Sequence, residues 1–149
     1  MRRKYLVDTN LISAGAPTKA SASAALVGWM DQNSAALFLS AVTVAEVSDG
    51  IAKASREGAA RKAAALSAWL DTLLHLYRER ILAFDVAVAR VAGTLSDAAR
   101  AQGQAPGFAD IVIAATARLH GLTILTRNIR HFEPLGVSVF DPFRELPEA

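Results

Sequence analysis

The chain begins with a short apolar run that stops abruptly at polar side chains. Residues 5–7 are Tyr-Leu-Val, and a carboxylate, a hydroxyl and an amide follow at Asp8, Thr9 and Asn10. Three apolar residues are too few for a helix, so this run predicts a buried β-strand. In open α/β sheets, ligands bind just beyond the carboxyl ends of the strands, where Asp8 would lie. Asp8 or Thr9 could instead only cap a helix that begins near Leu11, and the stretch by itself favours neither interpretation.

The same pattern of a short apolar run returns four times, and helical patterns separate the runs. Strands are predicted over residues 37–40, 81–84, 123–126 and 137–140. Helices are predicted from Ser21 or Ser23 to Asn33, from Thr43 with an interruption at Gly50, from Arg56 to Arg78, from Asp85 to Gln102, and from Phe108 to His120. Asp85 is interpreted as a helix cap rather than a catalytic group. Strands that alternate with helices predict an α/β fold whose parallel sheet is covered on both faces.

The composition is that of one packed domain over residues 1–149. Hydrophobic residues make up 52% of the chain and charged residues only 20%, which favours a core over disorder. There is no cysteine, so disulfides and thiolate zinc sites are excluded. No apolar run reaches membrane-spanning length, and the basic start meets Asp8 too soon to be a secretory signal, so we expect a cytoplasmic protein with no membrane association. The net charge of +2 leans weakly towards anionic partners.

Three carboxylates occur where predicted elements begin or end. Asp8 follows the first strand, Glu46 lies on the helix after the second, and Asp110 opens the helix before the fourth. The corresponding ends of parallel strands share one edge of a sheet, so these groups are expected to meet. Clustered carboxylates repel unless a hard divalent cation such as Mg²⁺ or Mn²⁺ neutralises them. The chemistry natural to such a site is metal-assisted hydrolysis of a phosphodiester.

Each of the last two acids also has a simpler interpretation. Glu46 has apolar neighbours along the chain, so it is either the one solvated position of its helix or a buried ligand. Asp110 in a first helical turn interacts favourably with the helix dipole whatever else it does.

Four blocks of the sequence, taken together, resemble the signature blocks of PIN-domain proteins. The blocks are residues 6–13, residues 39–46, residues 109–117, and residues 126–128 followed by Phe132. Their order and spacing are similar to those of the VapC and FitB-type toxins of bacterial toxin–antitoxin operons. The resemblance implies a three-layer α/β/α fold with a mostly parallel five-stranded sheet, Mg²⁺- or Mn²⁺-dependent ribonuclease activity, homodimers, and inhibition by a cognate antitoxin.

The resemblance also implies roles for individual residues. Asp8, Glu46 and Asp110 match the acidic metal-binding and catalytic residues of the family. Thr9 matches the hydroxyl that helps to position the attacking water, and Asn10 matches the polar residue beside it.

The fourth acid of the family is missing from its usual places. Those places hold Asn128 and the pair His131-Phe132, and Glu133 is nearby but displaced. The amide of Asn128 can offer an oxygen ligand or bind water, and His131 can replace a carboxylate. One negative charge fewer should weaken metal affinity, which leaves catalysis by two metal ions in doubt.

Basic residues surround the predicted acidic centre. Arg127 and Arg130 lie in the last block, Arg118 precedes it, and residues 2–4 precede the first strand. Cations beside an acidic centre can hold the phosphates that flank a scissile one, so Arg127 and Arg130 are predicted to bind RNA. Apolar residues on two early helices could further leave one groove for an antitoxin helix: Val27, Trp29, Met30, Val44 and Val47. The alternative is that they are ordinary core residues, which is favoured for Trp29.

Three functions of different classes are consistent with this pattern. The first is an endoribonuclease toxin, and the second is a PIN-fold protein that binds RNA or an antitoxin but cleaves poorly. The third is a phosphotransfer or dehalogenase-type enzyme with Asp8 as nucleophile, which is weakened because Asn10 stands where such phosphatases commonly carry a second aspartate.

Overall fold

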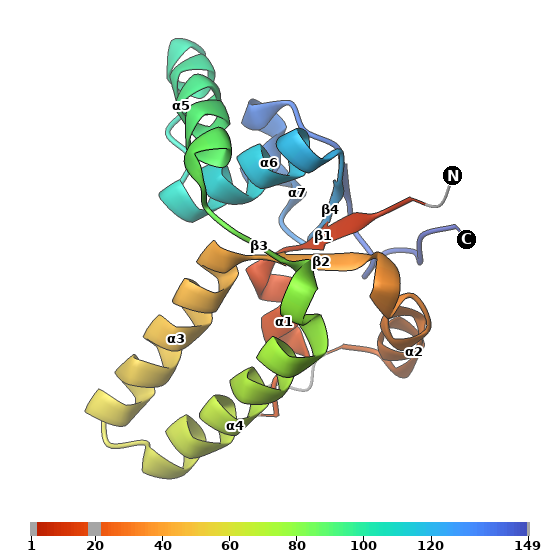
Figure 1. Ribbon diagram of the computed structural model, residues 1–149, viewed down its shortest axis with the longest axis vertical. Coiled ribbons are helices and arrows are strands. Elements are labelled where there is room, and N and C mark those ends of the chain that lie inside the picture. The colour runs from red at the N-terminus through yellow and green to blue at the C-terminus, as the bar shows by residue number, and fades with distance from the viewer. Residues whose placement is uncertain (1–2, 18–21, 149) are drawn as a thin grey trace.

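The computed structural model describes residues 3–17 and 22–148, which are built around five short strands (Figure 1). The strands are β1 (Tyr5–Val7), β2 (Leu37–Ser40), β3 (Ile81–Leu82), β4 (Thr123–Leu125) and β5 (Val139–Phe140). Their order across the sheet is β3-β2-β1-β4-β5, and every neighbouring pair is parallel. The predicted α/β class and five-stranded sheet are confirmed, and the sheet is parallel throughout.

Helices connect the strands in the alternation that the sequence predicts. In the described ranges the α-helices are α1 (Thr9–Ala14), α2 (Ala24–Gln32), α3 (Ala41–Arg56), α4 (Ala60–Tyr77), α5 (Val86–Ala101), α6 (Phe108–His120) and α7 (Ile129–Phe132). None of these helices combines the length and the apolar character that crossing a bilayer requires.

The central strand β1 is buried on both faces. Leu6 packs in one core cluster with Val112 of α6 and Phe132 of α7. Tyr5 and Val7 pack in a second cluster with side chains of α1, α2 and α4. Successive strand residues point to opposite faces of a sheet, so this split places helices on both sides of β1. Figure 1 shows the resulting three layers, with α5, α6 and α7 on one side of the sheet and α1, α2 and α4 on the other.

Helix α3 differs from its predicted form at its start and in its middle. Ser40 caps the helix by accepting a backbone N–H hydrogen bond with its hydroxyl, so α3 begins at Ala41 rather than at Thr43. The predicted interruption at Gly50 is wrong, because the helix continues to Arg56. Gly50 is exposed, and a glycine at an exposed position inside a helix costs only about 1 kcal/mol relative to alanine.

The helix predicted from Arg56 to Arg78 is α4, and it begins later, at Ala60. Gly58 has a φ of 84°, a left-handed conformation that glycine adopts without strain. The turn that contains it reverses the chain, so α3 and α4 pack against each other as an antiparallel pair (Figure 1). The beginning of α3, and with it Glu46, lies at the carboxyl edge of the sheet because the helix follows β2 directly, with Ser40 as its cap.

Two helix caps were predicted correctly, and three strands are shorter than predicted: β3 ends at residue 82 rather than 84, β4 at 125 rather than 126, and β5 begins at 139 rather than 137. Oδ1 of Asp85 accepts a 2.9 Å hydrogen bond from the backbone N–H of Val88, which confirms the capping role. Strand β3 therefore ends at Leu82, since the chain must leave the sheet before this cap. Ser23 caps α2, and the alternative cap, Ser21, lies outside the described residues.

Candidate active site

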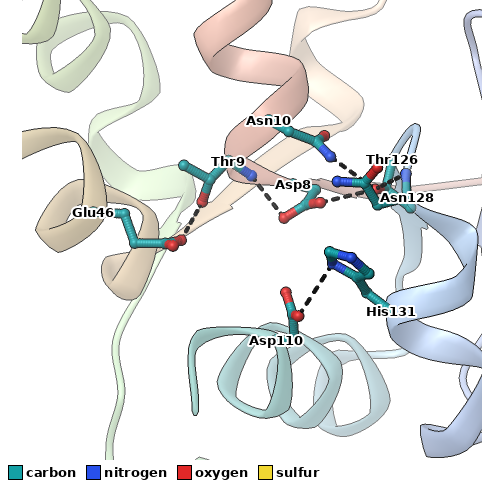
Figure 2. A network of polar contacts seen from close by, with 8 residues as sticks. All are labelled: Asp8, Thr9, Asn10, Glu46, Asp110, Thr126, Asn128 and His131. Atoms are coloured by element: carbon teal, nitrogen blue, oxygen red, sulfur yellow. Dashed lines mark hydrogen bonds and ion pairs between the residues drawn. The ribbon is translucent and has the colours of Figure 1, made fainter. Parts of the chain in front are cut away.

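Asp8 lies between β1 and α1, at the carboxyl edge of the sheet, and is only 5% exposed. Its Oδ1 accepts a hydrogen bond of 2.8 Å from the backbone N–H of Thr9, and its Oδ2 accepts one of 2.8 Å from the hydroxyl of Thr126 (Figure 2). Asp8 therefore caps α1, and it also lines a cleft at the end of the strand. Because burial and two hydrogen bonds restrict both oxygens, this geometry disfavours Asp8 as a nucleophile.

Thr126 is the site residue that the sequence analysis did not assign. It follows β4, is fully buried, and donates its hydroxyl proton to Asp8. The same oxygen accepts hydrogen bonds from the backbone N–H of Asn128 at 2.9 Å and from the amide of Asn10 at 3.5 Å. One hydroxyl therefore joins the loop after β1 to the loop after β4. The sequence did contain a signal for this role: Thr126 is a polar residue directly after an apolar strand, as Asp8 is.

Glu46 is exposed and nevertheless faces the cleft. Its Oε1 accepts a hydrogen bond of 2.6 Å from the hydroxyl of Thr9, and the Thr9 oxygen lies 2.9 Å from the hydroxyl oxygen of Thr43. Thr43 is buried on the first turn of α3, so it holds Thr9 from the side of the core. Glu46 is therefore not a buried side chain, and it is not the one solvated position of its helix either, because Ala45 and Ser48 are exposed too. It contacts the site from the solvent side, through Thr9.

Asp110 lies in the first turn of α6 and is half-buried. Its Oδ2 is 3.4 Å from Nδ1 of His131, which projects from α7 (Figure 2). Figure 2 shows the carboxylates of Asp8 and Asp110 on either side of this imidazole, while Glu46 and Thr9 lie across from them. The imidazole is thus part of the acidic site, at a position where the sequence lacks the acid expected from the family.

The carboxylates influence one another's protonation. Burial raises the pKa of Asp8 above its ordinary value of 3.8, and the charges of Asp110 and Glu46 raise it further. The hydrogen bonds from Thr126 and Thr9 act in the opposite direction and only partly offset these effects. Burial also raises the pKa of Asp110, where the charge of His131 opposes the shift and that of Glu46 adds to it. The three acids predicted to converge are therefore close enough to repel one another.

These groups line one open cleft of about 490 Å³. Side chains from the starts of α1, α3 and α6 form its acidic part, and the loop after β4 contributes Arg127 and Asn128. Asn128 lines the cleft, and its backbone N–H, rather than its side-chain amide, donates the hydrogen bond to Thr126.

Of the arginines that were predicted to lie near the acids and that the structure describes, only Arg127 lines the cleft itself. Arg127 lines the cleft, and its guanidinium carbon lies 4.3 Å from the ring centroid of Phe143, a cation–π contact that restricts the side chain. Arg130 lines an adjoining hollow of about 310 Å³ that shares His131 with the cleft. Arg118 does not line the cleft; its guanidinium donates at 3.4 Å to the backbone carbonyl of Gly136, which follows the 3-10 helix Glu133–Leu135.

The donor atoms around the cleft suit a hard divalent cation in their chemistry. They are mostly carboxylate, hydroxyl and amide oxygens, with the imidazole of His131 beside them. The buried Oδ1 of Asn10 has no hydrogen-bond partner within the described residues. As the side chains stand, no three His, Asp or Glu groups in residues 3–17 and 22–148 lie close enough to share one ion. Completing a shared site would therefore require side-chain movement, which the exposure of Glu46 permits.

The single apolar groove predicted between the early helices is two pockets. Val27 and Met30 line one of about 350 Å³, and Val47 lines another of about 290 Å³. Trp69 of α4 borders both pockets and divides them. Trp29 instead packs against the second core cluster, as a core residue would. The sequence prediction missed this division because it did not place α4 between the two helices.

The fold and the acidic cleft at the end of its central strands agree with the comparison to known families. The PIN domain family matches residues 5–135, so the chain belongs to the PIN-domain family. Its relatives in that family include a protein named as a toxin and one named as a ribonuclease. It is 35% identical over 142 residues to Toxin FitB of Neisseria gonorrhoeae, covering 94% of this chain and 99% of that protein. It is 34% identical over 139 residues to VapC ribonuclease Y4jK of Sinorhizobium fredii, covering 93% and 96%.

Solved structures of toxin–antitoxin complexes share the fold. FitAcB from Neisseria gonorrhoeae superimposes with a TM-score of 0.77 at 35% identity, covering 93% of this chain and 97% of the other. DNA-bound VapBC from Salmonella typhimurium superimposes with a TM-score of 0.78 at 22% identity, covering 94% and 98%, and supports the fold alone. The resemblance to VapC and FitB-type toxins is thereby confirmed.

Proposed function

We propose that this protein is a divalent-metal-dependent endoribonuclease and the toxin of a toxin–antitoxin pair. The observation that carries the proposal is the convergence of Asp8, Glu46 and Asp110, from three distant segments, on one cleft at the carboxyl edge of the sheet. The names of two relatives, VapC ribonuclease Y4jK and Ribonuclease VapC2 of Haemophilus influenzae, support RNA as the substrate.

Asp8, Asp110 and Glu46 would hold Mg²⁺ or Mn²⁺, which supplies charge neutralisation at the phosphoryl oxygens and lowers the pKa of a water molecule. Thr126 keeps one oxygen of Asp8 oriented by donating to it, and the Thr9 N–H orients the other. Thr9 donates to Oε1 of Glu46 in the same way, and the Thr43 hydroxyl contacts the Thr9 hydroxyl and so helps to hold it in place. These contacts preorganise the acids, so less reorganisation accompanies the reaction.

The cationic side of the cleft would bind the substrate. Arg127 lines the cleft beside the acids and is held against Phe143, so it can pair with a phosphate adjacent to the scissile one. Arg130 lies in the adjoining hollow and would bind a phosphate further along the strand. A single strand is the form of RNA whose backbone can enter such a cleft.

The partner of the protein would be a cognate antitoxin. The name of the relative Toxin FitB supports this partner, as does the FitAcB structure at 35% identity, in which this chain covers 97% of the aligned chain. We further expect homodimers and an action in the cytoplasm, where free RNA is found. Co-purification with the product of a neighbouring gene tests for the antitoxin, and sedimentation tests for the homodimer.

A second candidate function is supported by one observation. No three His, Asp or Glu groups in the described ranges share an ion as they stand, and His131 occupies a place where a further acid would strengthen metal binding. A PIN-fold protein that binds RNA without cleaving it efficiently would have such a site.

One assay separates the two functions. Purified protein is incubated with single-stranded RNA, with Mg²⁺, Mn²⁺ or EDTA, beside an Asp8→Asn variant prepared in the same way. The nuclease proposal expects metal-dependent cleavage by the parent and loss of that cleavage in the variant. If the variant cleaves as fast as the parent, the activity belongs to a contaminant; if neither cleaves but both bind RNA, the binding-only function replaces the proposal.

A further inference from the structure

Two exposed phenylalanines meet at the rim of the acidic cleft. Phe108 is 66% exposed and Phe84 is 45% exposed. Their ring centroids are 5.9 Å apart at an interplanar angle of 68°, which is an edge-to-face contact. We call these two residues the Phe84–Phe108 pair. Edge-to-face packing leaves at least one face of each ring uncovered by the other ring.

The pair is unusual among the aromatic residues of this chain. The sequence has six phenylalanines, and the other four pack within or against the core clusters: Phe38, Phe132, Phe140 and Phe143. Leaving two rings in water gives up the free energy that their burial would contribute. An exposed apolar cluster on a folded surface commonly marks a place where something binds.

The position of the pair connects it to the acidic site. Phe108 is the first residue of α6, two residues before Asp110, and it lines the same cleft as Asp8 and Arg127. Phe84 follows β3 at the same carboxyl edge of the sheet, just before the cap of α5. A polymer whose phosphate lies at the acids therefore has an aromatic surface within the same cleft.

We propose that the Phe84–Phe108 pair is a stacking platform for a nucleobase of single-stranded RNA, next to the phosphate held at the acids. This inference rests on the proposed function, because it takes RNA as the polymer in the cleft. Arg127 would bind the backbone while the rings bind the base, a division of labour that suits single strands. Stacking on phenylalanine accepts every base, so the platform adds affinity without sequence preference.

The competing occupant of this surface is a second copy of the chain. Val86, two residues after Phe84 in the sequence, is 76% exposed, so a further apolar side chain is available for such a contact. The two occupants differ in what they require. A contact between copies needs apolar area, which leucine also supplies, whereas base stacking needs a flat aromatic face.

The experiment measures RNA binding rather than cleavage. Fluorescence anisotropy is recorded in EDTA at constant salt with single-stranded RNA of about twelve nucleotides, the scale of one such site, and with an abasic ribose-phosphate oligomer of the same length. The variants are Phe108→Ala, Phe84→Ala, Phe108→Trp and Phe108→Leu. Leu119→Ala is the matched control, because Leu119 is another exposed apolar residue, near the opposite end of α6. Sedimentation velocity gives the oligomeric state of each variant.

Stacking expects Phe108→Ala to bind RNA about tenfold more weakly, with the affinity for the abasic oligomer unchanged. Phe84→Ala should show a smaller loss, Phe108→Leu should resemble Phe108→Ala, and Phe108→Trp and Leu119→Ala should resemble the parent. Equal RNA affinity in Phe108→Ala and the parent overturns the inference, as does full affinity in Phe108→Leu. Loss of self-association in Phe108→Ala with unchanged RNA binding assigns the surface to a second copy and overturns it too.

The design keeps this inference apart from the proposed function. If the parent does not cleave RNA with any metal but Phe108→Ala loses RNA affinity and not abasic affinity, the platform stands and the nuclease proposal fails. If the parent cleaves in a metal-dependent way while Phe108→Ala binds normally, the nuclease stands and the platform is wrong.

Discussion

The hydroxyl of Thr126 donates a 2.8 Å hydrogen bond to Oδ2 of Asp8 across 118 residues of sequence. The contact forms because β1 and β4 are neighbours in the sheet, with Val7 opposite Leu125, so the residues after both strands emerge side by side. Asp8 thereby receives one donor from its own helix and one from the loop that carries Arg127 and Asn128. The hydroxyl of Thr126 therefore links the loop after β1 to the loop after β4, and both loops flank the cleft.

Replacing Thr126 with Val should therefore destabilise the protein by about 1–3 kcal/mol. The substitution keeps the shape of the side chain but leaves a buried carboxylate oxygen without this donor and the backbone N–H of Asn128 without its acceptor. Urea denaturation measures the change, and cleavage should also fall because Asp8 loses its orientation. Thr126→Ser is the control and should behave like the parent. Equal stability of Thr126→Val and the parent would show that water replaces the hydroxyl at no cost.

The raised pKa values of Asp8 and Asp110 predict a direction for stability against pH in metal-free protein. The folded state binds protons more tightly than the unfolded state between 3.8 and the raised values. The unfolded state therefore binds fewer protons in this window, and the free energy of unfolding falls as the pH rises through it. At neutral pH the ionised acids remain a cost to folding.

Asp8→Asn should accordingly raise the Tm in EDTA at neutral pH by a few degrees, because it removes a buried, repelled charge. The difference between variant and parent should shrink as the pH falls towards 3.8, the ordinary pKa of an aspartate. Thermal unfolding followed at several pH values checks both statements. A variant less stable than the parent at every pH would mean that the hydrogen bonds of Asp8 outweigh burial and repulsion.

Metal binding should reverse that order of stability. Mg²⁺ or Mn²⁺ should raise the Tm of the parent in proportion to the logarithm of its concentration, and should raise that of Asp8→Asn much less. Because Asn128 and His131 stand in place of a further acid, we expect weak binding, and an oxygen-rich site should not select zinc. Titration calorimetry checks this; tight and selective Zn²⁺ binding would contradict the proposed donor set.

Thr9 and Glu46 should act as a unit. Thr9→Val removes the donor to Oε1 of Glu46, so cleavage should fall, and adding Glu46→Gln should then cost less than Glu46→Gln costs in the parent. The rates of the two single variants and the double variant, measured at saturating metal, give the coupling. Thr9→Ser, which keeps the hydroxyl, is the matched control. Additive losses would mean that the hydrogen bond contributes nothing to the reaction.

Substitutions of Arg127 and of Asp8 should distinguish RNA binding from RNA cleavage. Arg127→Ala should weaken RNA binding and lower the salt dependence by about one phosphate contact, whereas Asp8→Asn should abolish cleavage and leave binding largely intact. Arg118→Ala is the control, since Arg118 donates to a backbone carbonyl outside the cleft. Binding isotherms at several salt concentrations check the slopes. Arg127 has no role in substrate binding if its replacement leaves both affinity and slope unchanged.

Local patterns in the sequence were enough to predict the frame of this protein. The apolar run before Asp8 predicts a buried strand, and the alternation of such runs with helices predicts the parallel sheet and the edge at which Asp8, Glu46 and Asp110 meet. The cap at Asp85 was equally local. Each of these strands, helices and caps depends on residues within a few positions of one another, so the sequence pattern alone predicts them. Gly50 shows the limit, because a helix packed against α4 tolerates a residue that local propensity disfavours.

Only the tertiary structure decided how the site is held. Strand register brings Thr126 to Asp8, and the packing of α3 beside α1 brings Glu46 to Thr9, across 118 and 37 residues respectively. The pKa shifts of Asp8 and Asp110 and the meeting of Phe84 with Phe108 depend on the same distant packing. The sequence by itself determined which candidate catalytic and binding side chains the protein has, and that they lie at the carboxyl edge of the sheet. Their mutual distances are set by contacts between segments far apart in the chain, and such contacts leave no periodic pattern in the sequence.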